Sequence, residues 1–517
     1  MSSILGISGD ALINGQAVRG TQASFQAFDP AQGVEIAPAF YTVDNAQIDQ
    51  ACRAAQAAFD PFRGTTNLQR ADFLEAIGAQ ILALGDALIV RAMAESGLPR
   101  ARLEGERGRT VGQLKLFADL LRAGAWQDIR VDKPLPERAP PRPELRLRMI
   151  GLGPVAVFGA SNFPLAFSVA GGDTAAALAA GCPVVAKAHP AHPGTSELVA
   201  RAVVQAVADC GLPAGVFGLL TGVGNALGGE LVRHPAIQAV GFTGSRQGGV
   251  ALMAIAAARP QPIPVYAEMS SINPVFLLPQ ALAARGESIA AGLAASLTMG
   301  VGQFCTNPGL VLGLAGSHFE HFGFSLAKAL GAAPAGVMLT PGIAANYQRG
   351  VVHLASQDGV QTMLEPVASD TCKALPAVFR TTSAAFLASA ALAEEVFGPV
   401  TLLVECTDVD DMLSITEQLE GQLTATLQMD AGDLEAARRL LPALERKVGR
   451  ILANGYPTGV EVASAMVHGG PYPATSDGRS TSVGTAAIQR FLRPVCYQNF
   501  DEALLPQALR DGVPGHS

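Results

Sequence analysis

The spacing of apolar residues predicts that the first part of the chain is largely helical. From Asp44 or Asn45, either of which can cap a helix, apolar positions recur every three or four residues as far as Pro61, which is expected to end the helix. Two further helical patterns cover residues 67–96 and 107–121. The residues before Asp44 show no strong helical pattern. Their short apolar stretches indicate strands instead.

After residue 150 the pattern changes to short continuous apolar runs that alternate with helical stretches. Such alternation is typical of βαβ units, which build a parallel sheet covered by helices. The expected strands cover residues 155–159, 184–187, 216–220 and 239–242, and the expected helices cover residues 164–180, 195–210 and 226–234. We therefore predict a Rossmann-like nucleotide-binding fold in this part of the chain.

A second alternating set follows and predicts another α/β domain. Its expected strands cover residues 274–278, 309–314 and 400–404, and its expected helices cover residues 287–300, 319–330 and 434–441. Two stretches lie outside both sets. Residues 145–150 alternate apolar residues with arginine after a proline-rich linker, and residues 491–500 are expected to form a strand that pairs away from both sheets.

Charge and composition narrow the possible classes of function. The 517 residues include 36 basic and 44 acidic side chains, a net charge of −8, and no run of lysine or arginine. Binding to nucleic acid is therefore not expected, because it needs clustered positive charge. With 49% hydrophobic and 15% charged residues, the chain is predicted to be a well-packed globule rather than a disordered one.

Neither a membrane span nor export is indicated by the sequence. Residues 163–183 are the longest apolar stretch, but they include Asp173 and three glycines, so we interpret them as a buried helix. The first ten residues lack the basic start and apolar block of a secretory signal, which makes the cytoplasm the expected location. Seven cysteines, an odd number without a CxxC pair, fit a reducing compartment and argue against disulfides.

A metal site is not predicted. His189 and His192 lie three residues apart, as do His318 and His321. Neither pair has cysteines or carboxylates at ligand spacing beside it, and the first pair lies among prolines. An ordinary structural role is the simpler interpretation for these histidines.

Two turns at the ends of predicted strands carry groups that could contact a ligand. Asn162 follows the first strand of the nucleotide fold, where open parallel sheets bind ligands, and its carboxamide could hold a developing oxyanion. Alternatively, Asn162 only caps a helix that begins near Pro164. Gly244 and Ser245, with Gly249 shortly after them, could bring backbone N–H groups to a pyrophosphate, although this pattern does not match GxGxxG.

Cys305 and Glu268 are the candidate reactive groups. Cys305 lies in a glycine-flanked segment after a predicted helix, where a thiol can be exposed and reactive; the alternative is a buried, inert cysteine. Glu268 is a single carboxylate at the end of an apolar strand. If partly buried, with a raised pKa, it could act as a general base, and the alternative is a solvated side chain at a sheet edge.

Taken together, these motifs resemble the aldehyde dehydrogenase superfamily over nearly the whole chain. The motifs that occur in the family's order and at similar spacing are Asn162-Phe-Pro164, Lys187, Phe242-Thr-Gly-Ser245, Glu268, Gly302-Gln-Phe-Cys305 and Glu395-Val-Phe-Gly-Pro399. The resemblance implies an α/β fold with a Rossmann-like cofactor domain (residues 1–130 and 151–267), a catalytic domain (residues 268–487) and a small β bridging element (residues 131–150 and 488–517). In this family such an element joins subunits, so a homodimer or homotetramer is expected.

The resemblance also implies a role for each matching residue. Cys305 would attack a small aldehyde as a thiolate, while Asn162 and the Cys305 backbone N–H would hold the oxyanion. After hydride transfer to the nicotinamide, Glu268 would remove a proton from the water that hydrolyses the thioester. The implied cofactor contacts are Lys187 and Glu395 with the ribose hydroxyls, Gly244, Ser245 and Gly249 with the pyrophosphate, and Phe397 with the nicotinamide ribose.

Three departures from the family pattern are evident. The usual Glu-Leu-Gly-Gly is Glu268-Met-Ser-Ser271 here, which keeps the base and changes the turn behind it. Pro190 stands where many NAD-preferring members have a glutamate that repels a 2′-phosphate, so NADP is expected to be favoured over NAD, with His189 and His192 nearby. The usual Gly-Gly-x-Lys-x-Ser motif is replaced by residues 468–479.

Four segments resemble one branch of the superfamily, the α-ketoglutaric semialdehyde dehydrogenases, which oxidise 2,5-dioxovalerate to 2-oxoglutarate. These segments are residues 159–168, 187–195, 302–308 and 470–475. The alternatives are a related branch that oxidises long-chain fatty aldehydes, a CoA-acylating relative, and a non-catalytic cofactor-binding protein on the same scaffold. Retention of both Cys305 and Glu268 favours a hydrolytic enzyme over the last two.

Overall fold

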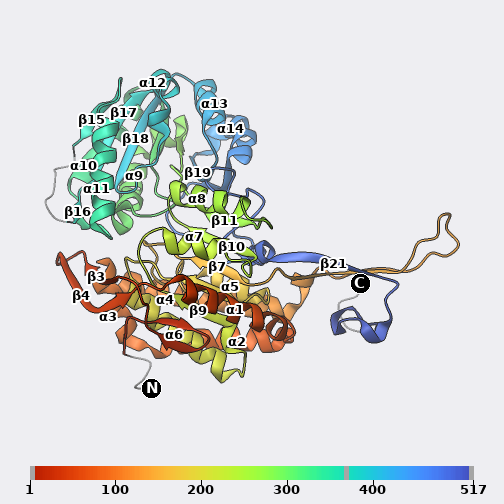
Figure 1. The fold of residues 1–517 in the computed structure, drawn as a ribbon. Helices are drawn as coiled ribbons and strands as arrows, with labels where there is room; N and C mark the ends of the chain where they lie inside the picture. The colour runs from red at the N-terminus through yellow and green to blue at the C-terminus, as the bar shows by residue number, and fades with distance from the viewer. Residues whose placement is uncertain (1–5, 366–371, 512–517) are drawn as a thin grey trace.

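The computed structural model describes residues 6–365 and 372–511. The first five residues of the stretch examined for a secretory signal and the last six of the predicted bridging element lie outside the described residues. Figure 1 shows two α/β bodies, one built mainly from the first half of the chain and one from the second, with a thin β-arm that carries β21 away from both.

The first body contains a seven-stranded sheet in the order β11-β10-β7-β8-β9-β1-β2, and the strands from β11 to β9 are parallel. Its strands are β1 (Ala11–Ile13), β2 (Gln16–Val18), β7 (Val155–Phe158), β8 (Val184–Lys187), β9 (Phe217–Leu220), β10 (Ala239–Thr243) and β11 (Val265–Glu268). The helices of the predicted βαβ units are α5 (Gly172–Ala179), α6 (Pro193–Asp209), α7 (Ala226–Arg233) and α8 (Arg246–Ala257). The predicted Rossmann-like alternation is therefore present.

Four helices from the N-terminal segment pack onto this sheet. They are α1 (Asn45–Arg63), α2 (Asn67–Ala83), α3 (Gly85–Ser96) and α4 (Arg100–Ala123), after a hairpin of β3 (Ser24–Asp29) and β4 (Val34–Tyr41). Asp44 caps α1 as predicted, but the helix includes Pro61 and ends at Arg63, two residues beyond the predicted end. The single helix expected over residues 67–96 is two helices bent by 76°.

The helix expected over residues 164–180 begins only at Gly172. Residues 160–171 form turns instead, because other partners take their backbone N–H groups: the Glu106 carboxylate accepts hydrogen bonds from the N–H groups of Leu165 and Ala166, at 2.8 and 3.0 Å. Asn162 is thus ten residues from the helix, and its alternative role as a helix cap is excluded. In the described part of the chain, no single helix is long and apolar enough to cross a membrane.

The second body contains the sheet β15-β17-β18-β13-β12-β19-β20, parallel except for its edge strand β15. Its strands are β12 (Val275–Leu277), β13 (Leu310–Leu314), β15 (Gln361–Leu364), β17 (Ala377–Thr382), β18 (Val400–Cys406), β19 (Gln422–Gln428) and β20 (Val448–Ala453). Its helices are α9 (Pro279–Thr298), α10 (Ser317–Gly331), α11 (Pro341–Ala355), α12 (Ser383–Ala388), α13 (Val409–Gln418) and α14 (Leu434–Lys447), and β14 (Gly336–Val337) pairs with β16 (Lys373–Ala374).

The projecting arm is a three-stranded antiparallel sheet separate from both bodies. Strand β21 (Leu492–Gln498) pairs along its whole length with β6 (Leu145–Gly151), which also pairs with β5 (Arg130–Asp132). The two segments predicted to lie outside the main sheets therefore pair with each other. The predicted domain boundaries themselves stay a prediction.

Candidate active site

Cys305 lies directly after a tight turn between α9 and β13 that depends on glycine. Gly300, Val301 and Gly302 all have positive φ angles, of 54°, 59° and 64°. A Cβ on Gly302 would lie 2.4 Å from the Gly398–Pro399 backbone, so glycine is required for the close approach of these two segments. The β-branched Val301 in this conformation marks local backbone strain directly before the reactive segment.

A buried polar network fixes the backbone at Cys305. The side-chain amide of Asn273 donates hydrogen bonds of 2.9 Å to the carbonyls of Cys305 and Asn307. Asn273 is itself held by Ser271, whose Oγ lies 2.9 Å from Asn273 Oδ1 and 3.0 Å from Gln422 Oε1. The serine that departs from the family's usual glycine thus adds support to the turn that presents the thiol.

Asn162 reaches the same segment from the end of β7. Its Nδ2 donates a 2.9 Å hydrogen bond to the carbonyl of Gln303, two residues before Cys305. The carboxamide is half-buried, and its second N–H has no partner among the described residues. The structure therefore brings the predicted oxyanion donor to the backbone that carries the thiol.

Glu268 is buried at the end of β11, with only 4% of its surface exposed. The segment after His468 pairs with this strand: Thr475 forms a β-bridge with Glu268, and the backbone N–H of Met269 donates to the carbonyl of Ala474. Ser482 Oγ donates a 2.9 Å hydrogen bond to Glu268 Oε2. The alternative of a solvated carboxylate at a sheet edge is excluded.

His468 lies between the thiol and the carboxylate, and sequence reasoning did not assign it a role. Its Nε2 is 2.8 Å from Glu268 Oε1 and 3.4 Å from Cys305 Sγ. The ligand-type atoms of these three side chains all lie within 4.8 Å of one another. The signal for His468 was present, since the segment that replaces the family's usual motif begins with this residue.

The electrostatics of this centre correct one expectation. Burial and the adjacent Glu268 carboxylate raise the pKa of Cys305 well above its usual range, so the resting thiol is protonated. Burial alone would also raise the pKa of Glu268, but the His468 imidazole and hydrogen bonds from His468, Ser482 and Cys305 hold it below its usual range. The predicted raised pKa of Glu268 is therefore wrong, because its hydrogen-bond partners outweigh desolvation.

A cleft of about 500 Å³ lies where β7, β8 and β10 end. Lys187, Pro190, Gly244 and Ser245 line it, as expected for cofactor contacts. Burial lowers the pKa of Lys187 to about 8, and its ammonium has no hydrogen-bond or ion-pair partner among the described residues. An uncompensated cation at the end of parallel strands, with the N-terminus of α8 nearby, suits the hydroxyl and phosphate oxygens of a dinucleotide.

Gly249 does not lie among the residues of this cleft. A Cβ at this position would come within 2.6 Å of the sulfur of Met269, so glycine here permits close packing of α8 on the end of β11. Its N–H donates to the carbonyl of Ser245 inside the helix, not outward. The expected pyrophosphate contact by Gly249 is therefore not what the structure shows.

His189 and His192, expected near a 2′-phosphate, are not positively charged at neutral pH. Burial lowers the pKa of His189 well below its usual value and also lowers that of His192. His192 is held by the Ala160 carbonyl at 2.9 Å and by Ser196 Oγ at 3.2 Å. Neither residue therefore offers positive charge to a 2′-phosphate at neutral pH, and this part of the argument for NADP is wrong.

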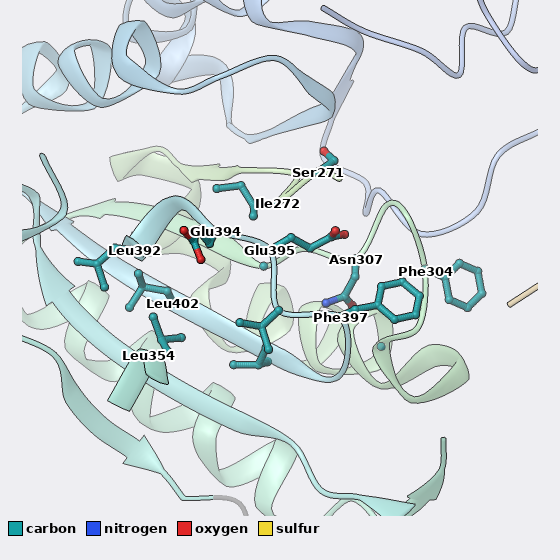
Figure 2. Close-up of a pocket in the computed structure, with 14 residues that line it drawn as sticks. Ser271, Ile272, Phe304, Asn307, Leu354, Leu392, Glu394, Glu395, Phe397 and Leu402 are labelled. Carbon is teal, nitrogen blue, oxygen red and sulfur yellow. The ribbon is translucent and has the colours of Figure 1, made fainter. Parts of the chain in front are cut away.

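Glu395 and Phe397 lie on the other side of the Cys305 turn. Figure 2 shows Glu395 and Glu394 pointing in opposite directions from one loop, with Glu395 toward Ser271 and Asn307. Burial raises the pKa of Glu395 to about 7, although contacts with Ser270 and Ser271 oppose the shift. The loop that carries the predicted ribose ligand thus packs against the turn that carries the thiol.

Residues 17–493 match the model of the aldehyde dehydrogenase family. The chain belongs to this family. It is 60% identical over 511 residues to "Alpha-ketoglutaric semialdehyde dehydrogenase 2" of Azospirillum brasilense, covering 98% of this chain and 97% of that protein. It is 49% identical over 515 residues to an alpha-ketoglutaric semialdehyde dehydrogenase of Acinetobacter baylyi, with coverage of 98% and 97%.

Solved structures support the fold at lower identity. Aldehyde dehydrogenase C of Pseudomonas syringae, solved with NAD+ and octanal, has a TM-score of 0.82 and 22% identity and covers 96% of this chain and 98% of that one. A 3,6-anhydro-L-galactose dehydrogenase solved with NADP has a TM-score of 0.80 and 21% identity, with coverage of 95% and 99%. The predicted family, fold class and enzyme class are confirmed, and the assigned roles of single residues stay predictions.

Proposed function

We propose that this protein oxidises 2,5-dioxovalerate to 2-oxoglutarate with NAD(P), through a thiohemiacetal and a thioester on Cys305. The observation that carries the proposal is the convergence of Cys305, His468 and Glu268 within 4.8 Å, beside the carboxamide of Asn162. The choice of aldehyde is supported by the full-length similarity to proteins named for this substrate. A long-chain fatty aldehyde or a non-catalytic role has no comparable support.

The first step activates the thiol. Because the resting thiol is protonated and hydrogen-bonded to Glu268, its proton moves to that carboxylate as the sulfur attacks the aldehyde carbon. His468, whose Nε2 contacts both groups, steadies the carboxylate and the developing thiolate. The carbonyl oxygen then becomes an oxyanion, held by the free N–H of Asn162 and the backbone N–H of Cys305.

The nicotinamide, when bound, supplies the hydride acceptor that turns the thiohemiacetal into a thioester. The proton on Glu268 is the one released when the thiol and the aldehyde become a thioester, so it must leave for solvent before hydrolysis. The product acid releases a second proton when it ionises. Glu268 then takes a proton from the attacking water, and the departing thiolate regains a proton from Glu268. Because its pKa is lowered, Glu268 is ionised before each step in which it accepts a proton, first from the thiol and later from water.

The cofactor site tolerates a 2′-phosphate. In the described part of the chain, no aspartate or glutamate lines the cleft that contains Lys187, and Pro190 takes the place of a repelling glutamate. We therefore propose that NADP is used at least as well as NAD, with Lys187, Glu395 and Phe397 contacting the two ribose units. This preference depends on Lys187 and on the absence, among the described residues of the cleft, of a carboxylate that would repel the 2′-phosphate. It does not depend on His189 and His192.

The proposal extends to assembly and location. The projecting β-arm presents β21 and β6 far from the body of the subunit, which suits contact with a second copy in a dimer or tetramer (Figure 1). All seven cysteines are free thiols, which suits a reducing compartment such as the cytoplasm.

The direct test is an activity assay on the purified enzyme with 2,5-dioxovalerate, glutaraldehyde and octanal, each with NAD and NADP. We expect the highest kcat/KM for 2,5-dioxovalerate, and loss of activity by at least about 10³-fold in Cys305→Ala with cofactor binding retained. Cys210→Ala, which removes an exposed thiol, is the matched control and should leave activity unchanged. Equal or better turnover of octanal would contradict the substrate, and an active Cys305→Ala would contradict the nucleophile.

A further inference from the structure

Two arginines from different bodies of the protein converge beside the reaction centre. Arg450 on β20 donates hydrogen bonds to the carbonyls of Pro457 and Gly459, at 2.6 and 3.0 Å. Arg109 on α4 donates through Nη1 to the carbonyl of Val460 in the same loop. This loop precedes His468 in the chain, so both guanidinium groups are fixed by the segment that leads into the active site.

A short chain of contacts joins Arg109 to the thiol. The Arg109 guanidinium carbon lies 5.3 Å from the centre of the Phe167 ring. That ring lies 6.0 Å from the His468 ring, whose Nε2 is 3.4 Å from Cys305 Sγ. Only one aromatic ring therefore separates the guanidinium from the catalytic imidazole.

In the described part of the chain, neither of these arginines forms an ion pair. Among the residues that the structure describes, no carboxylate lies within 4 Å of either guanidinium, in contrast to Arg102 on the same helix, which pairs with Glu106 at 3.1 Å. Arg109 Nη2 and Arg450 Nε are buried and have no hydrogen-bond partner within residues 6–365 and 372–511. Unpaired buried N–H donors of this kind are costly unless a ligand satisfies them.

The electrostatic surroundings agree with this geometry. Burial lowers the pKa of both guanidinium groups, and the Cys305 site interacts with each of them, which places both in the field of the reaction centre. Two carboxylates act on Arg109. Glu106 is already paired with Arg102, and Glu461 is exposed to solvent. Both cations therefore act on the same reaction centre.

We infer that Arg109, assisted by Arg450, binds the carboxylate of the substrate while the aldehyde at its other end reaches Cys305. The inference rests on the proposed function, because 2,5-dioxovalerate carries such a carboxylate and a fatty aldehyde does not. A planar guanidinium held by Val460 and stacked on Phe167 keeps its free edge for a carboxylate. The arginines would thereby select aldehydes with a negative charge at the far end.

The test compares 2,5-dioxovalerate with pentanal, an uncharged aldehyde of the same chain length, in wild type and Arg109→Met. We expect kcat/KM for 2,5-dioxovalerate to fall about 100-fold, mainly through KM, while kcat/KM for pentanal changes less than about threefold. Arg109→Lys should recover part of the loss, because it restores the charge without the planar fork. Arg107→Met, on the same helix with its guanidinium bonded to the Gly85 carbonyl, is the matched control.

Two outcomes in Arg109→Met would overturn the inference. Either kcat/KM falls by the same factor for both aldehydes, or kcat/KM for 2,5-dioxovalerate does not fall. If Arg109→Met does not fold, the same comparison in Arg109→Lys decides, because a smaller selective loss is expected there. If wild type does not oxidise 2,5-dioxovalerate, the proposed function fails. The arginine inference is then judged with succinic semialdehyde against butanal, where the same selective dependence on Arg109 is required.

Discussion

The cofactor cleft and the reaction centre are built in different ways. The cleft is lined by residues from consecutive βαβ units of one sheet, and its lining residues lie at strand ends that follow one another in the chain. The reaction centre joins Cys305 to a histidine 163 positions away and Glu268 to the same histidine 200 positions away. One site depends on local fold, and the other depends on contacts between the two bodies.

This difference determines how the two sites can change. A strand-end cleft keeps its form as long as the sheet forms, so single side chains tune its preference for NAD or NADP. In the reaction centre neighbouring side chains alter each other's pKa: burial and Glu268 raise the pKa of Cys305, and His468 lowers the pKa of Glu268. Substitutions in the centre should therefore alter chemistry, and substitutions in the cleft should alter cofactor binding alone.

The largest effect is expected from Glu268→Gln. Without the carboxylate, the attacking water cannot be deprotonated efficiently and the thiol loses its proton more slowly. Because hydrolysis is slowed more than the first turnover, we expect steady-state turnover to fall by about 10³-fold while the thioester still accumulates. Rapid-mixing absorbance should show a burst of reduced cofactor, and intact-mass spectrometry should show the acyl group on the protein. If the burst and the steady-state rate fell by the same factor and no acyl-enzyme formed, Glu268 would act in the first step only.

A smaller effect is expected from His468→Gln, about 10–100-fold in kcat/KM. Because His468 holds the pKa of Glu268 down, its removal should raise that pKa, so the acidic limb of the pH–rate profile should move to higher pH. The profile is measured as kcat/KM from pH 5 to 9, with His321→Gln, an exposed histidine, as the control. A lower rate with an unmoved acidic limb would reduce His468 to a packing role.

The smallest effect is expected in the cleft. Lys187→Met should raise KM for NAD and NADP about tenfold and leave the rate of the chemical step nearly unchanged. Since the pKa of Lys187 is lowered to about 8, wild-type affinity for the cofactor should weaken as the pH rises through that value, and the variant should lack this dependence. Steady-state kinetics measure KM, and titration by protein fluorescence measures how cofactor affinity depends on pH. If Lys187→Met also lost the burst of reduced cofactor at saturating cofactor, the cleft and the reaction centre would not be independent.

Sequence patterns predicted the strands of the first body well, because a buried parallel strand is a continuous apolar run, as in β7 and β8. They failed where side chains replace backbone partners. Glu106 takes two N–H groups of the turn after Asn162, and the expected helix there begins at Gly172. No local pattern reports such a contact between distant segments.

The candidate site shows the same limit. Cys305, Glu268 and Asn162 were found because they match family motifs, and the structure brings them to one place. The sign of the Glu268 pKa shift was wrong because Ser482 and His468 belong to a segment that only the fold places there. A departure from a family motif was the sole sequence sign of His468, and its meaning became clear only from its distance to the thiol.

If Cys305, His468 and Glu268 act as one unit, a double-substitution cycle should show it. The rate of the first turnover is measured in His468→Gln, in Glu268→Gln and in the variant that carries both changes. We expect the double variant to be about as slow as the slower single variant, because each change slows the same proton transfer from the thiol. Losses that multiply would contradict it, since they would mean that the imidazole and the carboxylate act independently.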